Sequence, residues 1–196
     1  ADVVLNGITG SIGLEPSIAA LQAGSQLALA NKESVVAGGH LLFSAQVREN
    51  QINPVDSEHS AIWQSLRSGT HAEVAKLVVT ASGGPFYGKK AAELKGMTRE
   101  DALQHPNWSM GAKITVDSAT LMNKGLEFIE AMHLYHMPPE KISIVIHRES
   151  IIHSLVEYCD NAMIAQLGAP DMRLPIQYAL TWPKRTPGPA VPLDLW

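Results

Sequence analysis

Residues 1–54 constrain the fold most, because strand and helix patterns alternate along them. Two helical segments, 16–21 and 32–47, separate three short strand-like runs, which lie at residues 3–5, 26–30 and 52–55. A strand–helix–strand–helix–strand order at this spacing favours a parallel, Rossmann-like sheet of the kind found in nucleotide-binding folds.

Three glycines, Gly7, Gly10 and Gly13, follow the first predicted strand. The fingerprint of a dinucleotide-binding loop is G-x-G-x-x-G, with an acidic residue about 20 residues further on. Here the glycines are three positions apart, although Glu33 lies near the expected distance. The spacing therefore favours a tight strand-to-helix turn, with dinucleotide binding as the alternative.

Asp56 and Glu58 come directly after the third predicted strand. Ligand sites in parallel α/β sheets gather at the carboxyl ends of strands, and two carboxylates two positions apart can face one cation. Carboxylates without thiolates suit Mg²⁺ or Mn²⁺ better than Zn²⁺. The alternative is that Asp56 or Ser57 only caps the helix that follows.

The small residues Ser82, Gly83 and Gly84 follow a buried strand predicted at residues 77–80. Small residues at a strand end let backbone N–H groups approach an oxyanion. The segment is therefore either a phosphate contact or a plain turn.

Residues 86–112 are predicted to be mostly loop. They include His105, Trp108 and Met110 between a proline and a glycine, a pattern that resembles a lid over a ligand. The alternative is that Trp108 is a surface residue in a dimer contact.

Segment 117–127 combines a helix start with polar side chains. Asp117 and Ser118 are good N-cap residues, and a helix N-terminus attracts anions. Asn123 lies four positions and Lys124 three positions before Glu127, so these side chains are neighbours on one side of the predicted helix. The segment predicts a phosphate site with a carboxylate one turn further on, or else a solvated amphipathic helix with a charge pair.

Residues 142–180 predict a mixed sheet after the first one. Strand patterns at 142–146, 151–158 and 162–167 form a meander that points to antiparallel additions, and a helix is expected over 171–180. His147 and His153 could reach a site, although a lone histidine in a strand is more often structural. The fold class predicted for the whole chain is α/β, with an α+β central part.

Composition excludes several function classes. The 196 residues carry a formal net charge of −4 and no long basic run, so nucleic-acid binding through a basic patch is not expected. The longest apolar runs are strand-sized, so no membrane span or membrane partner is expected. A single cysteine, Cys159, excludes an internal disulfide and fits a reducing compartment such as the cytoplasm.

Six motifs occur in one order along the chain. They are ANKES at 30–34, PVDSEHS at 54–60, TASGGPF at 80–86, HPNWSMG at 105–111, the segment 115–127, and HS at 153–154. Together they closely resemble the 1-deoxy-D-xylulose 5-phosphate reductoisomerase family, NADPH-dependent enzymes of the non-mevalonate route to isoprenoids. The resemblance covers essentially the whole sequence.

The resemblance implies three regions. Residues 1–55 would be the C-terminal part of an NADPH-binding Rossmann-like domain, and residues 56–182 a central catalytic domain. Residues 183–196 would be a Pro-rich linker toward a C-terminal helical domain. The sequence would then be a fragment, without the cofactor half-domain that carries the family's glycine fingerprint and without the C-terminal domain.

The resemblance also implies residue roles. The ligands of a Mg²⁺ or Mn²⁺ ion would be Asp56, Glu58 and Glu127. The substrate would be held beside the metal by Ser57 and at its phosphate by four side chains, those of Ser82, Ser118, Asn123 and Lys124. His105 and Trp108 would lie on the lid, and His153 would face the same pocket. Four residues would lie near the cofactor, namely Lys32, Glu33, Met110 and Gly111.

The implied activity converts 1-deoxy-D-xylulose 5-phosphate to 2-C-methyl-D-erythritol 4-phosphate in a homodimer. A metal-assisted rearrangement of the carbon skeleton would precede hydride reduction by NADPH. Two alternatives stay open, namely a metal-dependent phosphosugar isomerase or aldolase without nicotinamide, and a non-catalytic phosphosugar-binding fragment.

Overall fold

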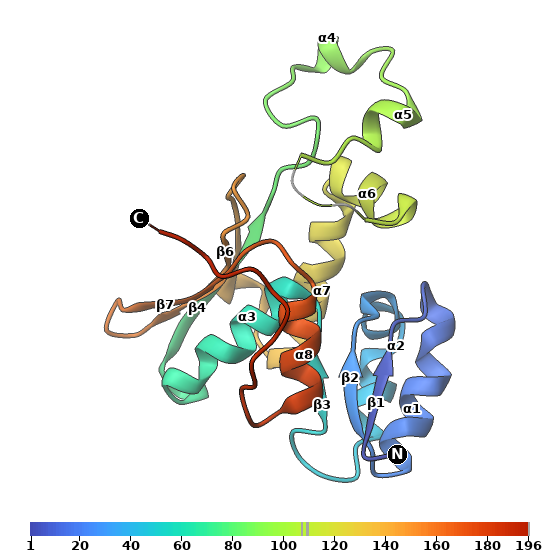
Figure 1. Ribbon diagram of the computed structural model, residues 1–196, viewed down its shortest axis with the longest axis vertical. Coiled ribbons are helices and arrows are strands. Elements are labelled where there is room, and N and C mark those ends of the chain that lie inside the picture. Colours follow the sequence, from blue (N-terminus) through green and yellow to red (C-terminus); the bar gives the residue numbers. More distant parts are fainter. Residues whose placement is uncertain (107, 109, 196) are drawn as a thin grey trace.

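Helix α7 (Met122–Tyr135) lies between two β-sheets in the computed structural model, which describes residues 1–106, 108 and 110–195 (Figure 1). Helix α2 (Lys32–Ser44) packs against one side of α7, and the four-stranded sheet lies on the other side. A Cβ atom at Gly39 would lie 2.6 Å from the ring of His133. The missing side chain at position 39 therefore lets α2 approach α7 closely.

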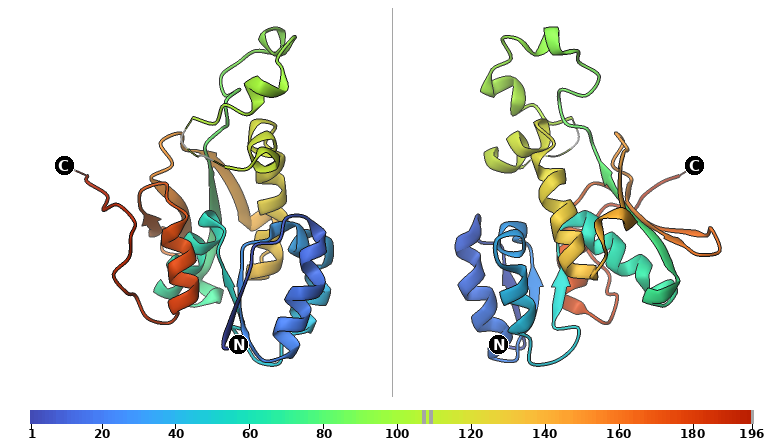
Figure 2. Two further views of the ribbon diagram at one scale, coloured as in Figure 1. Left: turned by 45° about the vertical axis from the view of Figure 1, so that its right-hand side comes forward. Right: turned by 180° about the vertical axis from the view of Figure 1, so that it is seen from behind.

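The N-terminal sheet is parallel, as predicted. Its strands pair in the order β1 (Val3–Asn6), β2 (Gln26–Leu29) and β3 (Ile52–Pro54). Leu27 and Leu29 pack into a core with α1 (Leu14–Gln22) and α2 on one face of the sheet. Ala28 belongs to a second apolar cluster, which contains Ala179 of α8 (Arg173–Thr181). Because successive strand residues point to opposite faces, helices cover both faces of this sheet (Figure 2).

The turn between β1 and α1 is tied down by two asparagines. Asn6 Nδ2 donates to Gly13 O (2.7 Å), and Asn31 Nδ2 donates to Gly10 O (2.7 Å). Asn31 Oδ1 also accepts from Ser34 N (2.7 Å) and so caps α2. These bonds fit the tight strand-to-helix turn that the glycine spacing predicts.

The second sheet is mixed, with strand order β5-β4-β6-β7. Its strands are β4 (Val74–Ala81), β5 (Ile142–Ile146), β6 (Ile152–Tyr158) and β7 (Met163–Leu167). The β6 and β7 strands are antiparallel additions, as expected, but β5 pairs parallel to β4. The mixed sheet is as predicted, but the expected meander is wrong at β5, because the α6–α7 crossover returns the chain in the direction of β4.

The predicted helix start at Asp117 and Ser118 is wrong. These residues belong to the last turn of α6 (Ala112–Ala119), and α7 begins only at Met122. Between the helices Leu121 adopts a left-handed conformation (φ 61°), which breaks the α-helical ladder. No side chain caps the start of α7, so Asp117 and Ser118 do not create an anion site by capping.

The other elements complete the chain. The segment after β4 carries α4 (Ala91–Leu94) and α5 (Arg99–Ala102), and Thr98 caps α5 in a capping box with Asp101. Helix α3 (Ser57–Ser65) follows β3, and short 3₁₀ turns lie at Ser11–Gly13, Leu66–Ser68, His71–Glu73 and Pro139–Lys141. Among the described residues, we find no helix whose length and apolar character would let it cross a membrane.

Candidate active site

One cavity collects strand ends from both sheets. β3, β4 and β5 run toward it, and β6 begins beside it, because β6 is antiparallel to β4 with Val79 opposite Ser154. Asp56, Ser82 and His147 follow the three ending strands, and His153 lies at the start of β6. The topology therefore brings residues from distant parts of the sequence to the same place.

Most of the predicted site residues line this cavity. They are Lys32, Asp56, Ser57, Glu58, Ser82, His105, Trp108, Met110, Ser118, Asn123, Lys124, Glu127 and His153. Glu33 and Gly111 do not line it; Glu33 instead pairs with Lys113 Nζ (2.7 Å), which also contacts Asp117 Oδ2 (2.7 Å). Asn107 and Ser109 of the predicted lid lie outside the described residues, as does Trp196 of the predicted linker.

Three carboxylates form a candidate metal centre. Asp56, Glu58 and Glu127 each offer one oxygen, and these oxygens lie within 4.8 Å of one another. Asp56 occupies the N-cap position of α3, but its side chain makes no capping hydrogen bond. Its carboxylate points into the cluster instead, so the capping alternative does not describe this side chain.

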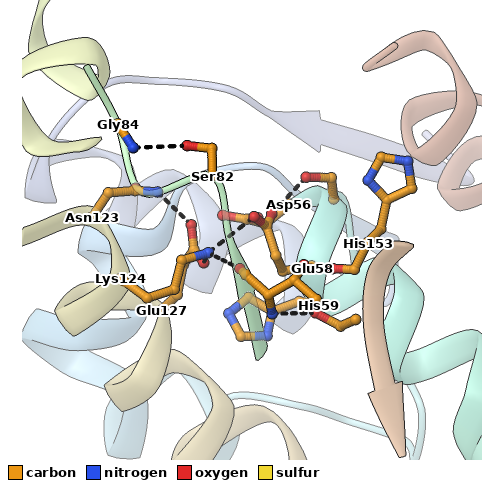
Figure 3. Close-up of polar contacts among 12 residues, drawn as sticks. Asp56, Glu58, His59, Ser82, Gly84, Asn123, Lys124, Glu127 and His153 are labelled. Atoms are coloured by element: carbon orange, nitrogen blue, oxygen red, sulfur yellow. Dashed lines mark hydrogen bonds and ion pairs between the residues drawn. The ribbon is translucent and has the colours of Figure 1, made fainter. Parts of the chain in front are cut away.

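Two lysines compensate the charge of the carboxylates, and Figure 3 shows one of them, Lys124, beside Glu58 and Glu127. Lys32 Nζ lies 2.6 Å from Asp56 Oδ2 and 2.8 Å from Glu127 Oε1. Lys124 Nζ lies 2.9 Å from Glu58 Oε1 and also contacts Glu127 Oε2 and the carbonyl oxygen of Thr80. We call these five side chains, Lys32, Asp56, Glu58, Lys124 and Glu127, the cavity floor.

The floor shifts the pKa values of its own groups. Burial alone would raise the pKa of Asp56, but the Lys32 ammonium holds it well below its usual range. Burial, and then the neighbouring Glu127 charge, raise the pKa of Glu58 to about 7. Burial would lower the pKa of Lys32 and Lys124, but the surrounding carboxylates raise both. The floor holds three acidic groups and only two ammonium groups, so the binding of one more cation would stabilise it electrostatically.

A second buried acid–base pair lies behind the floor. His59 Nε2 is 3.0 Å from Glu130 Oε2, and the two side chains are 0% and 2% exposed. Burial would lower the pKa of His59, but Glu130 and then Asp56 raise it to about 8.

The residues predicted to hold a phosphate converge above the floor. A Cβ at Gly84 (φ +65°) would lie 2.6 Å from Ser118 O, so glycine lets the loop after β4 rest on the end of α6 and brings Ser82 and Ser118 to one wall. Asn123 Nδ2 donates to Glu127 Oε1 (2.5 Å), and Asn123 Oδ1 accepts from Lys32 Nζ (2.7 Å). Asn123 and Lys124 therefore bond the carboxylate cluster as well as facing the cavity.

The lid residues close the cavity from the other side. His105 Nε2 lies 2.9 Å from Ser82 Oγ, and Trp108 N–H donates to His105 Nδ1 (3.0 Å). The Trp108 ring lies 6.2 Å from the ring of His153. His153 Nε2 lies 3.1 Å from Gly168 O, and burial lowers the pKa of its ring.

Sequence reasoning missed several lining groups. The cavity also contacts Thr80, Leu121, Ser150 and Met172. His147 lines it as well, in agreement with the prediction that it could reach a site. His147 Nε2 accepts backbone N–H groups of Ile151 (3.2 Å) and Ile152 (3.1 Å), so the structural role holds as well. No local pattern marks Thr80, whose contribution is a backbone carbonyl oxygen.

The fold and the cavity define an α/β chain with a candidate divalent-metal site at the junction of two sheets. Three family models match it: "1-deoxy-D-xylulose 5-phosphate reductoisomerase" over residues 1–39, "1-deoxy-D-xylulose 5-phosphate reductoisomerase C-terminal domain" over 52–135, and "DXP reductoisomerase C-terminal domain" over 167–196. The chain belongs to the 1-deoxy-D-xylulose 5-phosphate reductoisomerase family.

Similar proteins agree with this membership. The 1-deoxy-D-xylulose 5-phosphate reductoisomerase of Bifidobacterium longum (strain DJO10A) is 71% identical, over 99% of this chain and 49% of that protein. The protein of the same name from Beutenbergia cavernae is 61% identical, over 98% of this chain and 49% of its own length. The chain therefore spans about half the length of these curated relatives.

Solved structures share the fold. A crystal structure of DOX-P reductoisomerase in complex with NADPH, fosmidomycin and magnesium matches with a TM-score of 0.93 and 45% identity, over 100% of this chain and 50% of that one. The Zymomonas mobilis enzyme in complex with NADPH matches with a TM-score of 0.90 and 49% identity, over 99% of this chain and 50% of that one. The predicted α/β fold class is confirmed.

Proposed function

We propose that this chain carries the metal- and phosphosugar-binding part of a 1-deoxy-D-xylulose 5-phosphate reductoisomerase. The reaction would convert 1-deoxy-D-xylulose 5-phosphate to 2-C-methyl-D-erythritol 4-phosphate, with NADPH as the reductant. The carboxylate cluster at the cavity floor is the observation that carries this proposal. Relatives named for this reaction, and related structures that contain NADPH and magnesium, support it.

The floor residues fit a divalent cation by their chemistry. Asp56, Glu58 and Glu127 offer only hard oxygen donors, which suit Mg²⁺ or Mn²⁺. The raised pKa of Glu58 reflects its burial first and then repulsion by the Glu127 carboxylate, and a cation would relieve this repulsion. When bound, such an ion supplies Lewis-acid polarisation of substrate oxygens and a template that orients them.

The other residues would bind and orient the substrate. Ser82, Ser118, Asn123 and Lys124 would hold the phosphate, so that binding energy far from the reacting carbons orients them. Ser57 Oγ donates to Glu58 Oε2 (2.5 Å) and so lies beside the metal ligands, where it would contact the substrate. The ring of Trp108, packed near His153, would exclude water from the reacting carbons.

The cofactor proposal concerns four residues in and around the cavity. Lys32 and Met110 line the cavity and would lie near the nicotinamide, while Glu33 and Gly111 lie outside it and would act at its edge. NADPH would supply the hydride, and no side chain replaces it. We keep residues 1–55, 56–182 and 183–196 as the proposed cofactor-domain part, catalytic domain and linker.

We also infer a homodimer that acts in the cytoplasm. Edge strand β5 exposes Ile144, Val145 and Ile146, and a second copy would cover this apolar edge. The exposed free thiol of Cys159 fits a reducing compartment.

The test measures NADPH absorbance with 1-deoxy-D-xylulose 5-phosphate and Mg²⁺, next to calorimetric titrations with Mn²⁺ and with fosmidomycin. Metal-dependent NADPH consumption is the result expected of the complete proposal. Binding of metal and fosmidomycin without turnover would support the non-catalytic phosphosugar-binding alternative. Failure to bind either ligand would contradict the proposed function.

A further inference from the structure

A buried histidine–glutamate pair links the two helices that supply metal-ligating side chains. His59 is the neighbour of Glu58 on α3, and Glu130 lies one turn beyond Glu127 on α7. The relative exposures of His59 and Glu130 are 0% and 1%. His59 Nε2 and Glu130 Oε2 are 3.0 Å apart, so the pair joins α3 to α7 next to the cavity floor. Figure 3 shows His59 beside Glu58.

Burying this pair between α3 and α7 costs more free energy than burying apolar side chains there would. Within the described part of the chain, neither ring nitrogen of His59 nor Oε2 of Glu130 has a hydrogen-bond partner of good geometry. Buried polar groups without good hydrogen bonds cost free energy. Apolar side chains of the same volume often serve a buried interface as well or better, so packing alone does not account for the pair.

The position of the pair provides a reason for that cost. The oxygens of Glu58 and Glu127 can reach one ion only if α3 and α7 keep a fixed spacing and rotation. Tyr135 Oη donates to the carbonyl oxygen of His59 (2.6 Å), which is a second polar link between the same two helices. The ion pair and this hydrogen bond together oppose sliding and rotation of the two helices, whereas apolar contacts tolerate repacking.

We propose that His59 and Glu130 are positioning residues for the divalent-metal site. They hold Glu58 and Glu127 at the separation that one Mg²⁺ or Mn²⁺ ion requires. They act through these two carboxylates and contact neither the metal nor the substrate. This inference rests on the proposed function, because it presupposes a metal between Asp56, Glu58 and Glu127.

The test uses Mn²⁺ alone as the probe, and electron paramagnetic resonance of free Mn²⁺ gives the dissociation constant. We expect Glu130→Gln and His59→Gln each to weaken Mn²⁺ binding roughly 10–100-fold, the range found for partners of metal ligands. The double variant pairs two amides and leaves no unpaired buried charge. It should bind Mn²⁺ more tightly than either single variant, so the two changes should be non-additive.

Ile62→Val is the matched control for loss of packing. Ile62 is fully buried on the same helix α3 and belongs to the core that contains Tyr135. This substitution should lower thermal stability without changing the Mn²⁺ dissociation constant. If Glu130→Gln does not fold, Tyr135→Phe tests the same link, and it should weaken Mn²⁺ binding by a smaller factor than His59→Gln.

The outcomes separate this inference from the proposed function. If the unaltered protein does not bind Mn²⁺, the proposed metal site fails, and this inference fails with it. If the unaltered protein binds Mn²⁺ and the variants at His59, Glu130 and Tyr135 bind equally tightly, only the positioning role is overturned. The positioning role would also be overturned if the double variant bound Mn²⁺ no more tightly than the single variants. An equal loss of Mn²⁺ affinity in Ile62→Val would overturn it as well.

Discussion

The floor of the cavity and its lid are built from different kinds of interaction. The five floor side chains come from three separate elements and compensate one another's charge in near-complete burial. The lid residues His105, Trp108 and Met110 are only half-buried. The contacts seen in the described part of the chain include the hydrogen bonds of His105 to Ser82 and Trp108 and the ring contact of Trp108 with His153. Changes in the floor should therefore alter stability and metal affinity together, whereas changes in the lid should alter ligand binding alone.

Glu127→Gln should have the largest effect. Glu127 is 1% exposed and accepts contacts from both floor lysines, so the substitution leaves buried ammonium groups short of a partner. Breaking a buried pair costs roughly 3–5 kcal/mol. We expect a stability loss of that order in urea unfolding and no measurable Mn²⁺ binding. Unchanged Mn²⁺ affinity would remove Glu127 from the metal site.

Lys124→Met should separate the Mn²⁺ affinity of the floor from its contribution to the stability of the metal-free protein. The Lys124 ammonium competes with a metal ion for Glu58 and Glu127, so its removal should tighten Mn²⁺ binding by about tenfold, or about 1.4 kcal/mol. The metal-free protein should become less stable, because two carboxylates lose a partner. Lys113→Met, at a half-exposed lysine, is the control and should change neither quantity much. A weakened Mn²⁺ affinity in Lys124→Met would contradict this competition.

Trp108→Ala should test the lid alone. Trp108 contacts the cavity through its ring but takes no part in the floor pairs. We expect stability to change by no more than about 0.5 kcal/mol and Mn²⁺ affinity to stay the same. Fosmidomycin should bind about tenfold more weakly, which is about 1.4 kcal/mol in calorimetry. A loss of stability as large as this loss of fosmidomycin binding free energy would show that the lid and the floor are not independent.

Acidification should produce the smallest of these effects. Glu58 of the floor, with a pKa of about 7, titrates over the same range, so the lid is followed through Trp108. Because Nδ1 of His105 accepts from Trp108 N–H, the closed lid needs a neutral ring. Burial lowers the pKa of His105, and Arg148 lowers it further, so the folded pKa lies below the unfolded value of about 6.5. The lid contact is therefore fully present above that unfolded value and is lost as the pH falls through the lower, folded pKa.

Tryptophan fluorescence can follow this loss, with Trp108→Phe identifying the signal of Trp108. We expect a change in the Trp108 signal below about pH 6.5 while the floor stays folded. A signal from Trp108 that is constant across this range would exclude the His105 contact as the basis of lid closure.

The sequence predicted the arrangement of strands and most of the site, because these depend on local patterns. The order of apolar runs and turns in residues 1–54 was enough for the parallel sheet. Asp56 and Ser82 each follow the end of a strand, where ligand sites gather, but their strands belong to two different sheets, so strand order alone does not bring them to one site. The family motifs supplied the remaining positions.

The sequence failed where tertiary contacts override local preference. Asp117 and Ser118 have cap-forming side chains, yet they lie in the last turn of α6, and Leu121 takes the left-handed conformation that a local pattern assigns to glycine or asparagine. The alternative of a solvated amphipathic helix with a charge pair does not describe α7 either. Met122 and Ile129 are exposed, whereas the polar residues Lys124, Glu127 and Glu130 are buried. Their burial depends on partners from α2 and α3, which no local pattern of α7 contains.

Anomalous diffraction from crystals soaked in Mn²⁺ tests the central claim most directly. The account predicts one strong manganese peak at about 2.0–2.2 Å from one oxygen each of Asp56, Glu58 and Glu127. The ammonium groups of Lys32 and Lys124 should be displaced from those oxygens. A manganese peak elsewhere, or an unchanged floor with both lysines still bound to the carboxylates, would contradict the account.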